Sequence, residues 1–128
     1  MVWLIKIDLN THLNFKIIYQ GNILNQPDVR RLYQIIDVRE VNELQVSSIQ
    51  GADIINLPLS RANEYTQDIL DGKILDKSKP TICLCKVGMR SMRMAMYLTQ
   101  QAGFNEVYNV DGGITEYAQE VDNSIALY

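Results

Sequence analysis

The chain has 128 residues, a formal net charge of −3 and a hydrophobic fraction of 47%, which together describe one globular domain with its own core. The negative charge disfavours non-specific binding to nucleic acids, and no apolar run approaches the ~20 residues that a membrane-spanning helix needs. The apolar run Val2–Ile5 is too short for the core of a secretory signal. We therefore expect a cytoplasmic domain that binds neither nucleic acid nor membranes.

Strands and helices are predicted in alternation along the chain. Short apolar and β-branched runs bounded by turn residues predict strands at 3–7, 15–19, 33–38, within 51–58, at 81–84 and at 106–110. Helical spacing of apolar residues predicts helices within 23–32 and at 41–47, 60–70, 90–102 and 114–119. Pro27 suits the first turn of the first helix, and Ser60 is placed to cap the third. The alternation predicts an α/β fold with a parallel sheet flanked by helices on both faces.

The number and spacing of the cysteines limit the kinds of site that the chain can form. Cys83 and Cys85 are the only cysteines, and His12 is the only histidine. Two cysteines separated by one residue form no disulfide framework, and with one distant histidine they supply too few ligands for zinc. We therefore expect neither a metal nor a cofactor.

The segment from Cys85 to Ser91 lies between a predicted strand and a predicted helix and is the candidate reaction centre. A helix N-terminus has unpaired N–H groups and a partial positive charge, and Lys86 and Arg90 add full positive charges. A thiol in this place is expected to lose its proton readily, and the thiolate is the reactive form of cysteine. We therefore assign Cys85 as the nucleophile, whereas Cys83, inside the strand, is expected to be buried and inert.

Polar residues follow a second predicted strand. Sites in parallel sheets lie at the carboxyl ends of the strands, so Asp37 and Cys85, each at the end of a predicted strand, are expected to face one crevice. Asp37 and Arg39 are interpreted as structural partners that support the site by holding the strand end. Arg90 could be a solvated helix residue, but its place in the loop favours anion contact or bracing of the loop, and the sequence leaves these two roles open. Lys86 either attracts an anion or is only a surface charge.

Four short blocks resemble the rhodanese family of sulfurtransferases, in the family's order. The blocks are Ile36–Glu40, Gly51–Pro58, Cys85–Ser91 and Gly112–Ile114. The resemblance implies a rhodanese-like α/β fold with a central, mainly parallel sheet flanked by helices on both faces. It forms a single domain over residues 1–128, with a core at about 33–118 and an atypical segment at 1–32. The motif Cys-Lys-x-Gly-x-Arg-Ser, the stretch Glu43–Ala52 and the ending Glu120–Tyr128 carry a finer similarity. They resemble the rhodanese domains fused behind adenylyltransferases that are similar to the ubiquitin-activating enzyme and serve molybdopterin and tRNA sulfuration.

Sulfur transfer in two steps is the activity that the resemblance implies. The Cys85 thiolate attacks the outer sulfur of thiosulfate or of a persulfide donor, and the resulting persulfide passes its terminal sulfur to a thiophilic acceptor. Exchange at sulfur requires no dedicated general base, and the loop's backbone N–H groups can stabilise the anion. The predicted substrate- and anion-binding residues are Lys86, Val87, Gly88, Met89, Arg90 and Ser91. The partner is a small sulfur donor, or else a protein that donates or accepts sulfur.

Two other functions stay open. Phosphatases of the related cysteine-loop type use a Cys-x5-Arg loop, whereas four residues separate Cys85 from Arg90 here. The shorter loop is expected to suit a sulfane sulfur and to exclude a phosphate ester. The other alternative is a non-catalytic binding or regulatory module, since some rhodanese-like domains are regulatory and have lost the cysteine. A cysteine protease is disfavoured, because nothing marks a His/Asn pair around the thiol.

Overall fold

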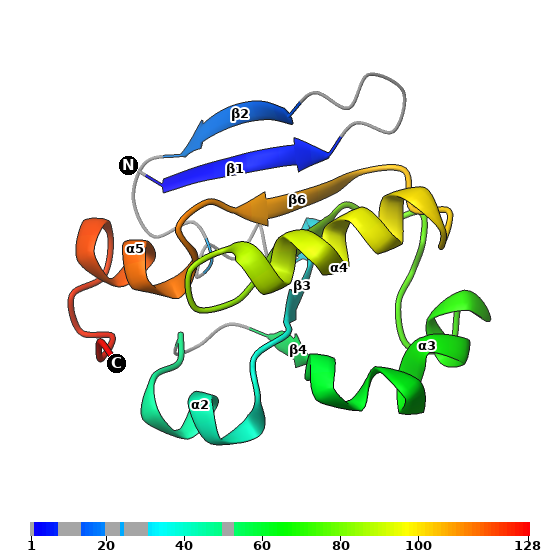
Figure 1. Ribbon diagram of the computed structural model, residues 1–128. Coiled ribbons are helices and arrows are strands. Elements are labelled where there is room, and N and C mark those ends of the chain that lie inside the picture. The colour runs from blue at the N-terminus through cyan, green and yellow to red at the C-terminus, as the bar shows by residue number, and fades with distance from the viewer. Residues whose placement is uncertain (1, 8–13, 20–23, 25–30, 50–52) are drawn as a thin grey trace.

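The computed structural model describes residues 2–7, 14–19, 24, 31–49 and 53–128. Within them a six-stranded sheet has the order β2-β1-β6-β5-β3-β4 (Figure 1). The strands are β1 (Val2–Ile7), β2 (Asn14–Tyr19), β3 (Gln34–Asp37), β4 (Ile54–Asn56), β5 (Thr81–Leu84) and β6 (Val107–Val110). The helices are α2 (Val41–Val46), the 3-10 helix η2 (Leu59–Arg61), α3 (Ala62–Leu70), α4 (Met89–Gln100) and α5 (Gly113–Glu120). The helix expected within 23–32, including its start at Pro27, lies mostly outside the described residues.

Strand direction in the sheet is mainly parallel, as predicted. β3 pairs in parallel with β4 and β5, and β5 pairs in parallel with β6. β1 is antiparallel to both β2 and β6 and extends the sheet at that edge. The register places Cys83 of β5 between Ile36 of β3 and Asn109 of β6. The loop that follows β5 therefore emerges at the centre of the sheet, between the carboxyl ends of its two neighbours.

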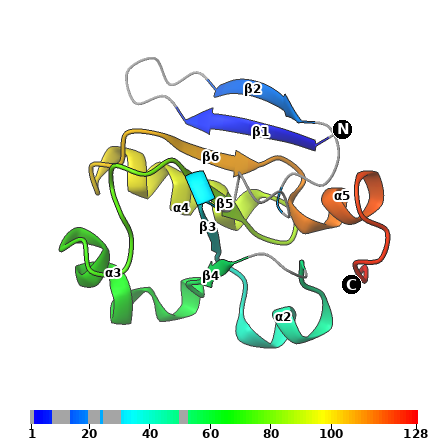
Figure 2. The same cartoon turned by 180° about the vertical axis from the view of Figure 1, so that it is seen from behind.

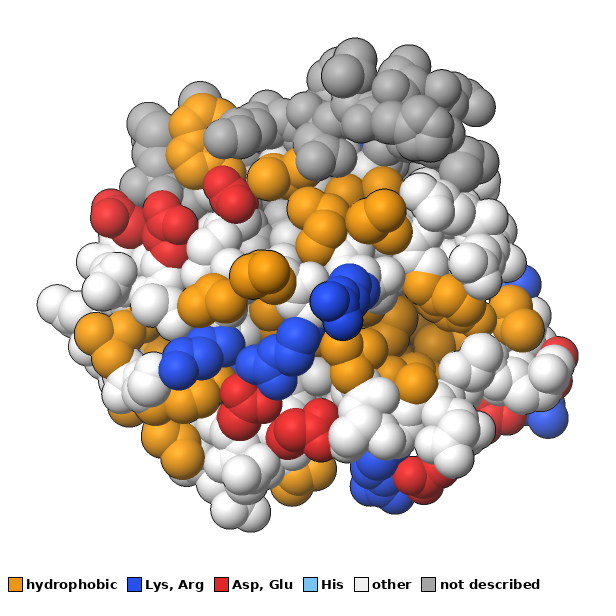
Figure 3. Space-filling model, in the orientation of Figure 1, with side chains coloured by type: hydrophobic (Ala, Val, Ile, Leu, Met, Phe, Trp, Pro, Cys, Tyr) orange, Lys and Arg blue, Asp and Glu red, His pale blue; other side chains and the backbone are white. Residues whose placement is uncertain are grey.

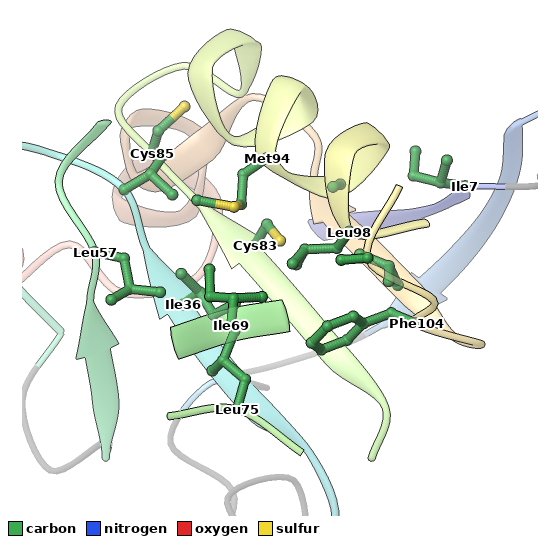
Figure 4. Packing of buried hydrophobic residues seen from close by; sticks show 14 of the residues in the cluster. Ile7, Ile36, Leu57, Ile69, Leu75, Cys83, Cys85, Met94, Leu98 and Phe104 are labelled. Atoms are coloured by element: carbon green, nitrogen blue, oxygen red, sulfur yellow. The ribbon is translucent and has the colours of Figure 1, made fainter. Parts of the chain in front are cut away.

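Helices cover both faces of the sheet, which confirms the predicted architecture. Successive strand residues point to opposite faces, and they pack into two separate hydrophobic clusters. The cluster under α3 and α4 includes Ile36, Ile69, Cys83 and Leu98 (Figure 4). The cluster under α5 includes Ile35, Ile82, Leu84, Ile114 and Tyr117. α4 lies in front of the sheet in Figure 1 and behind it in Figure 2.

The start of α3 corrects one prediction. Ser60 does not cap this helix, because an additional 3-10 turn, η2, precedes it and places Arg61 at the N-cap position. The Ser60 hydroxyl instead donates a hydrogen bond to the Glu40 side chain, which lies after β3. None of the described helices is long and apolar enough to cross a membrane.

Candidate active site

The loop between β5 and α4 is short because a glycine allows it to turn sharply. Cys85 follows directly after β5, and Gly88 precedes the first residue of α4 with a φ of 99°. That left-handed conformation strains other residues. A Cβ atom on Gly88 would also lie 3.2 Å from the Val110 carbonyl oxygen. Gly88 therefore lets the loop fold tightly against the end of β6.

Hydrogen-bond donors converge on the sulfur of Cys85. The backbone N–H of Gly88 donates to Sγ at 3.1 Å and that of Ser91 at 3.3 Å. The Ser91 hydroxyl lies 3.2 Å from the same sulfur. These groups lie at the N-terminal end of α4, so the positive end of the helix dipole also points at the sulfur. The arrangement can stabilise a negative charge on sulfur.

Asn109 orients these donors, although it lies outside every motif in the sequence that marks the site. Its Nδ2 donates to the Gly88 carbonyl oxygen at 2.9 Å, so its Oδ1 faces the Ser91 hydroxyl at 2.5 Å. That hydroxyl has one proton and donates either to Asn109 or to the sulfur at any moment. The signal that could have revealed Asn109 is an amide within the buried strand β6, where an unpaired polar group is unfavourable.

Cys83 differs sharply from Cys85 in its surroundings. It is fully buried in the cluster under α4, as predicted. Burial, and secondly the neighbouring Cys85, raises the pKa of Cys83 well above its ordinary value. A thiol with a raised pKa is poorly reactive, so the prediction that Cys83 is inert has a physical basis.

The start of α5 supports the loop from behind. The N–H groups of Ile114 and Thr115 donate to the carbonyl oxygens of Cys85 and Lys86, at 2.9 and 3.0 Å. These bonds require close approach of the two backbones at Gly113, whose φ is 62°. The block 112–114, which the sequence analysis linked to the rhodanese family, therefore has a defined mechanical role at the loop.

Replacing Gly113 with alanine is expected to destabilise the protein by roughly 2–4 kcal/mol, from overpacking and from the left-handed φ. The new Cβ would lie 2.4 Å from the Lys86 carbonyl oxygen and 2.6 Å from that of Cys85. Gly72→Ala is the matched control, because Gly72 has a φ of 72° but no atom within 4 Å of such a Cβ. Urea unfolding measures both variants. Equal losses of stability would show that contact with the loop is not the cause.

Arg90 braces the loop through a long-range ion pair. Its two terminal nitrogens donate to the carboxylate of Glu43 at 2.7 and 2.9 Å. The same carboxylate accepts a hydrogen bond from the N–H of Glu40 and so closes a capping box at the start of α2. Of the two roles left open for Arg90, the structure shows the bracing contact, and direct contact with an anion stays a prediction.

Acid is expected to weaken the link between Glu43 and Arg90. The hydrogen bonds from Arg90 lower the pKa of Glu43 to about 2. Because the folded-state pKa lies below the unfolded value, the stabilisation is complete above about pH 4.5 and disappears as the pH falls towards 2. Glu43→Gln should cost roughly 1–2 kcal/mol at pH 7, since the Arg90 side chain is 35% exposed and partly screened. In urea unfolding, the stability gap between wild type and variant should shrink from pH 5 to pH 3; a constant gap would contradict this.

Asp37 and Arg39 form a buried unit beside the site. Arg39 has no exposed surface, and its guanidinium holds both carboxylate oxygens of Asp37 at 2.8 to 3.1 Å. Burial alone would lower the pKa of Arg39, but hydrogen bonds with Asp37 and Tyr128 outweigh it and raise that pKa. The two side chains are therefore paired at the end of β3, and their supporting role in the site stays a prediction. Asp37 pairs in register with Leu84, the residue before Cys85, so both predicted residues lie at the same edge of the sheet. Within the described part of the chain no hydrogen bond joins Asp37 or Arg39 to Cys85, and the common crevice stays a prediction.

Tyr128 links these parts, a role that no local pattern in the sequence indicates. Its hydroxyl accepts a hydrogen bond from Arg39 at 3.0 Å and donates one to Glu43 at 3.1 Å. Its ring lies under the ammonium group of Lys86, 4.5 Å from the ring centroid, a favourable cation–π distance. Tyr128 thus connects the Arg39–Asp37 pair, the Glu43–Arg90 ion pair and Lys86 in the loop after β5.

Two exposed apolar side chains lie beside Cys85, which is itself recessed. Val87 and Met89 are 50% and 74% exposed, whereas Cys85 is 1% exposed. Among the described residues no group of three or more His, Cys, Asp or Glu side chains could hold a metal ion. The reactive group that these residues offer is therefore the Cys85 thiol, surrounded by backbone hydrogen-bond donors.

Sequence comparisons connect this arrangement to known proteins. The family model described as Rhodanese-like domain matches residues 21–120. The chain is 44% identical over 95 residues to the Rhodanese-like/PpiC domain-containing protein 12, chloroplastic, of Arabidopsis thaliana, covering 74% of this chain and 30% of that protein. It is 28% identical over 97 residues to the tRNA uridine(34) hydroxylase of Bordetella pertussis, covering 76% of this chain and 38% of that one. The chain thus spans about a third of the length of these relatives.

Solved structures agree with the sequence comparisons. A rhodanese-related protein from Thermoplasma volcanium superposes with a TM-score of 0.57 at 32% identity, covering 73% of this chain and 83% of the other. Reduced Bacillus anthracis CoADR-RHD superposes with a TM-score of 0.55 at 30% identity, covering 77% of this chain and 16% of that chain. The match is therefore to a rhodanese-type unit that also occurs within larger proteins.

Proposed function

The chain belongs to the family of rhodanese-like domains, and on that premise we propose that it is a sulfurtransferase in which Cys85 carries the transferred sulfur as a persulfide. The observation that carries the proposal is the convergence of the Gly88 and Ser91 donors on the Cys85 sulfur. A persulfide places its negative charge one atom farther out, and a loop of N–H groups suits an anion there.

The reaction balances without a redox partner. The Cys85 thiolate attacks the outer sulfur of thiosulfate, the S–S bond of thiosulfate breaks, and sulfite leaves with the bonding electron pair. With a persulfide donor the leaving group is the donor thiolate. The terminal sulfur of the Cys85 persulfide is then attacked by a thiophile, and the cysteine thiolate is regenerated. A good leaving group promotes each exchange.

Charge around the loop favours a donor that binds mainly through backbone groups and Lys86. Glu43 neutralises Arg90, so Lys86 is the loop cation left to attract an anionic donor, with its ammonium group over the Tyr128 ring. The exposed side chains of Val87 and Met89 supply an apolar rim beside the nucleophile. That rim supports a donor or acceptor carried on a protein as the physiological partner, with thiosulfate as a small surrogate.

A non-catalytic binding module is the second candidate, and one observation favours it. Cys85 is only 1% exposed, whereas reactive cysteines are usually partially exposed. The structure does not support the phosphatase alternative. The Arg90 guanidinium is hydrogen-bonded to Glu43 and is therefore not free to bind a phosphate group.

A steady-state assay separates these functions. Purified protein is supplied with thiosulfate or glutathione persulfide as donor and cyanide as acceptor, and thiocyanate is measured; p-nitrophenyl phosphate is offered in parallel. We expect multiple turnovers of thiocyanate with at least one donor and no hydrolysis of the phosphate ester. Phosphate hydrolysis lost in Cys85→Ala would favour the phosphatase, and no transfer from either donor would favour the binding module.

A further inference from the structure

The hydroxyl of Ser91 lies between two hydrogen-bond acceptors. Its oxygen is 3.2 Å from the Cys85 sulfur and 2.5 Å from Oδ1 of Asn109. A hydroxyl has one proton, so Ser91 donates to one of the two acceptors at a time. Ser91 and Asn109 are 0% and 2% exposed, and apolar and basic side chains cover the region of α4 above them (Figure 3). The direction of the hydroxyl therefore depends on the chemical state of its two buried acceptors.

The orientation of the Asn109 amide is fixed by the loop after β5. Its Nδ2 donates to the carbonyl oxygen of Gly88 at 2.9 Å, and a carbonyl oxygen can only accept, so the amide cannot be turned around. Its Oδ1, which can also only accept, therefore faces Ser91. The same Gly88 carbonyl oxygen accepts a second hydrogen bond, from the N–H of Met92 at 3.2 Å. Asn109 thus offers the Ser91 proton a fixed, neutral acceptor in addition to the sulfur.

The charge on the Cys85 sulfur decides which acceptor the Ser91 hydroxyl takes. In the sulfur transfer proposed above, on which this inference rests, Cys85 alternates between a thiolate and a persulfide. The thiolate has its negative charge on Sγ, and hydrogen bonds to an ionised acceptor are roughly twice as strong as neutral ones. In the persulfide the charge lies on the terminal sulfur, and Sγ, bonded to carbon and to sulfur, is a weak acceptor like a thioether. The hydroxyl therefore donates to Sγ in the thiolate and to Asn109 in the persulfide.

We propose that Ser91 is a catalytic residue for sulfur release and that Asn109 is its positioning residue. The acceptor attacks the terminal sulfur of the persulfide, the S–S bond breaks, and the bonding electron pair passes to Sγ of Cys85. As negative charge develops on Sγ, the Ser91 hydroxyl turns from Asn109 to the sulfur and stabilises the leaving thiolate. Its proton stays bonded to Ser91 throughout. Asn109 holds the hydroxyl beside the sulfur while the cysteine carries the persulfide.

The equilibrium between thiolate and persulfide tests the proposal. The protein is equilibrated with thiosulfate and sulfite, or with glutathione persulfide and glutathione, at about pH 9.5, above the ordinary pKa of a thiol, and intact mass gives the persulfide fraction. Ser91→Ala loses a bond to a charged acceptor in the thiolate and a weaker, neutral one in the persulfide. The equilibrium should therefore shift towards the persulfide by roughly fivefold or more. Asn109→Leu loses the bond from Ser91 only in the persulfide and should shift the equilibrium towards the thiolate by roughly threefold or more.

Thr99→Val is the matched control, because it removes another buried hydroxyl of α4, which donates to the Ala95 carbonyl oxygen at 2.8 Å. It should leave the equilibrium unchanged, and urea unfolding verifies that all three variants are folded. Shifts in the same direction for Ser91→Ala and Asn109→Leu, or shifts no larger than that of Thr99→Val, would overturn this proposal and leave the persulfide mechanism intact. A wild type that forms no persulfide with either donor would instead contradict the proposed function, and this inference with it.

Discussion

Replacement of Arg39 with methionine is expected to destabilise the protein by roughly 3–5 kcal/mol, the usual loss when one partner of a buried ion pair is removed. Arg39 is fully buried and its pair with Asp37 is 2.8 Å long. Its removal leaves the Asp37 carboxylate buried without its cation. The Ser47 carbonyl oxygen also loses the hydrogen bond that Arg39 donates at 2.8 Å. Urea unfolding at pH 7 measures the effect.

Two further variants isolate the cause of that loss. Arg61→Met breaks an exposed pair, with side chains 59% and 54% exposed, and should change stability by less than about 1 kcal/mol. The double variant Asp37→Leu with Arg39→Met should recover part of the loss, because it removes the uncompensated charge. If Arg39→Met unfolds as readily as Arg61→Met, the buried pair does not hold the end of β3.

Replacement of Cys85 with alanine is expected to abolish sulfur transfer, whereas Cys83→Ala keeps it. Cys85 is the thiol that accepts hydrogen bonds from the loop donors. Cys83 is buried in the cluster under α4, so its truncation leaves a small cavity and should cost about 1 kcal/mol. The measurement is the rate of thiocyanate formation by each variant, with urea unfolding to verify that both are folded.

Cys83 and Cys85 are only two residues apart, so removing one thiol at a time is needed to tell which of them carries the sulfur. Transfer that persists in Cys85→Ala and disappears in Cys83→Ala would move the nucleophile into the strand. Transfer that disappears in both folded variants would point to a dependence on local packing instead of on one thiol.

Local patterns were sufficient to predict the centre of the fold. β5 has the predicted bounds 81–84, because a buried apolar run there is delimited by Pro80 and by the charged loop. The register then brings Asn109 next to Cys83, a consequence of strand pairing that no local pattern contains. The prediction of Ser60 as a cap failed for a local reason, since an additional 3-10 turn moved the helix start.

The contacts that brace the site could not be predicted, because their partners are far apart in sequence. Glu43 on α2 contacts Arg90 on α4 and Tyr128 beyond α5, and these contacts depend on how the three segments pack together. Nothing in the residues around Arg90 indicates a carboxylate partner. The domain bounds, the cytoplasmic location and the absence of nucleic-acid and membrane partners stay predictions.

The intact mass of the reduced protein, before and after incubation with thiosulfate or glutathione persulfide, tests the central proposal most directly. A persulfide on Cys85 predicts the gain of one sulfur atom in the wild type and in Cys83→Ala, and no gain in Cys85→Ala. The absence of a gain in all three proteins with both donors would contradict the sulfurtransferase mechanism and leave the binding module as the better account of this domain.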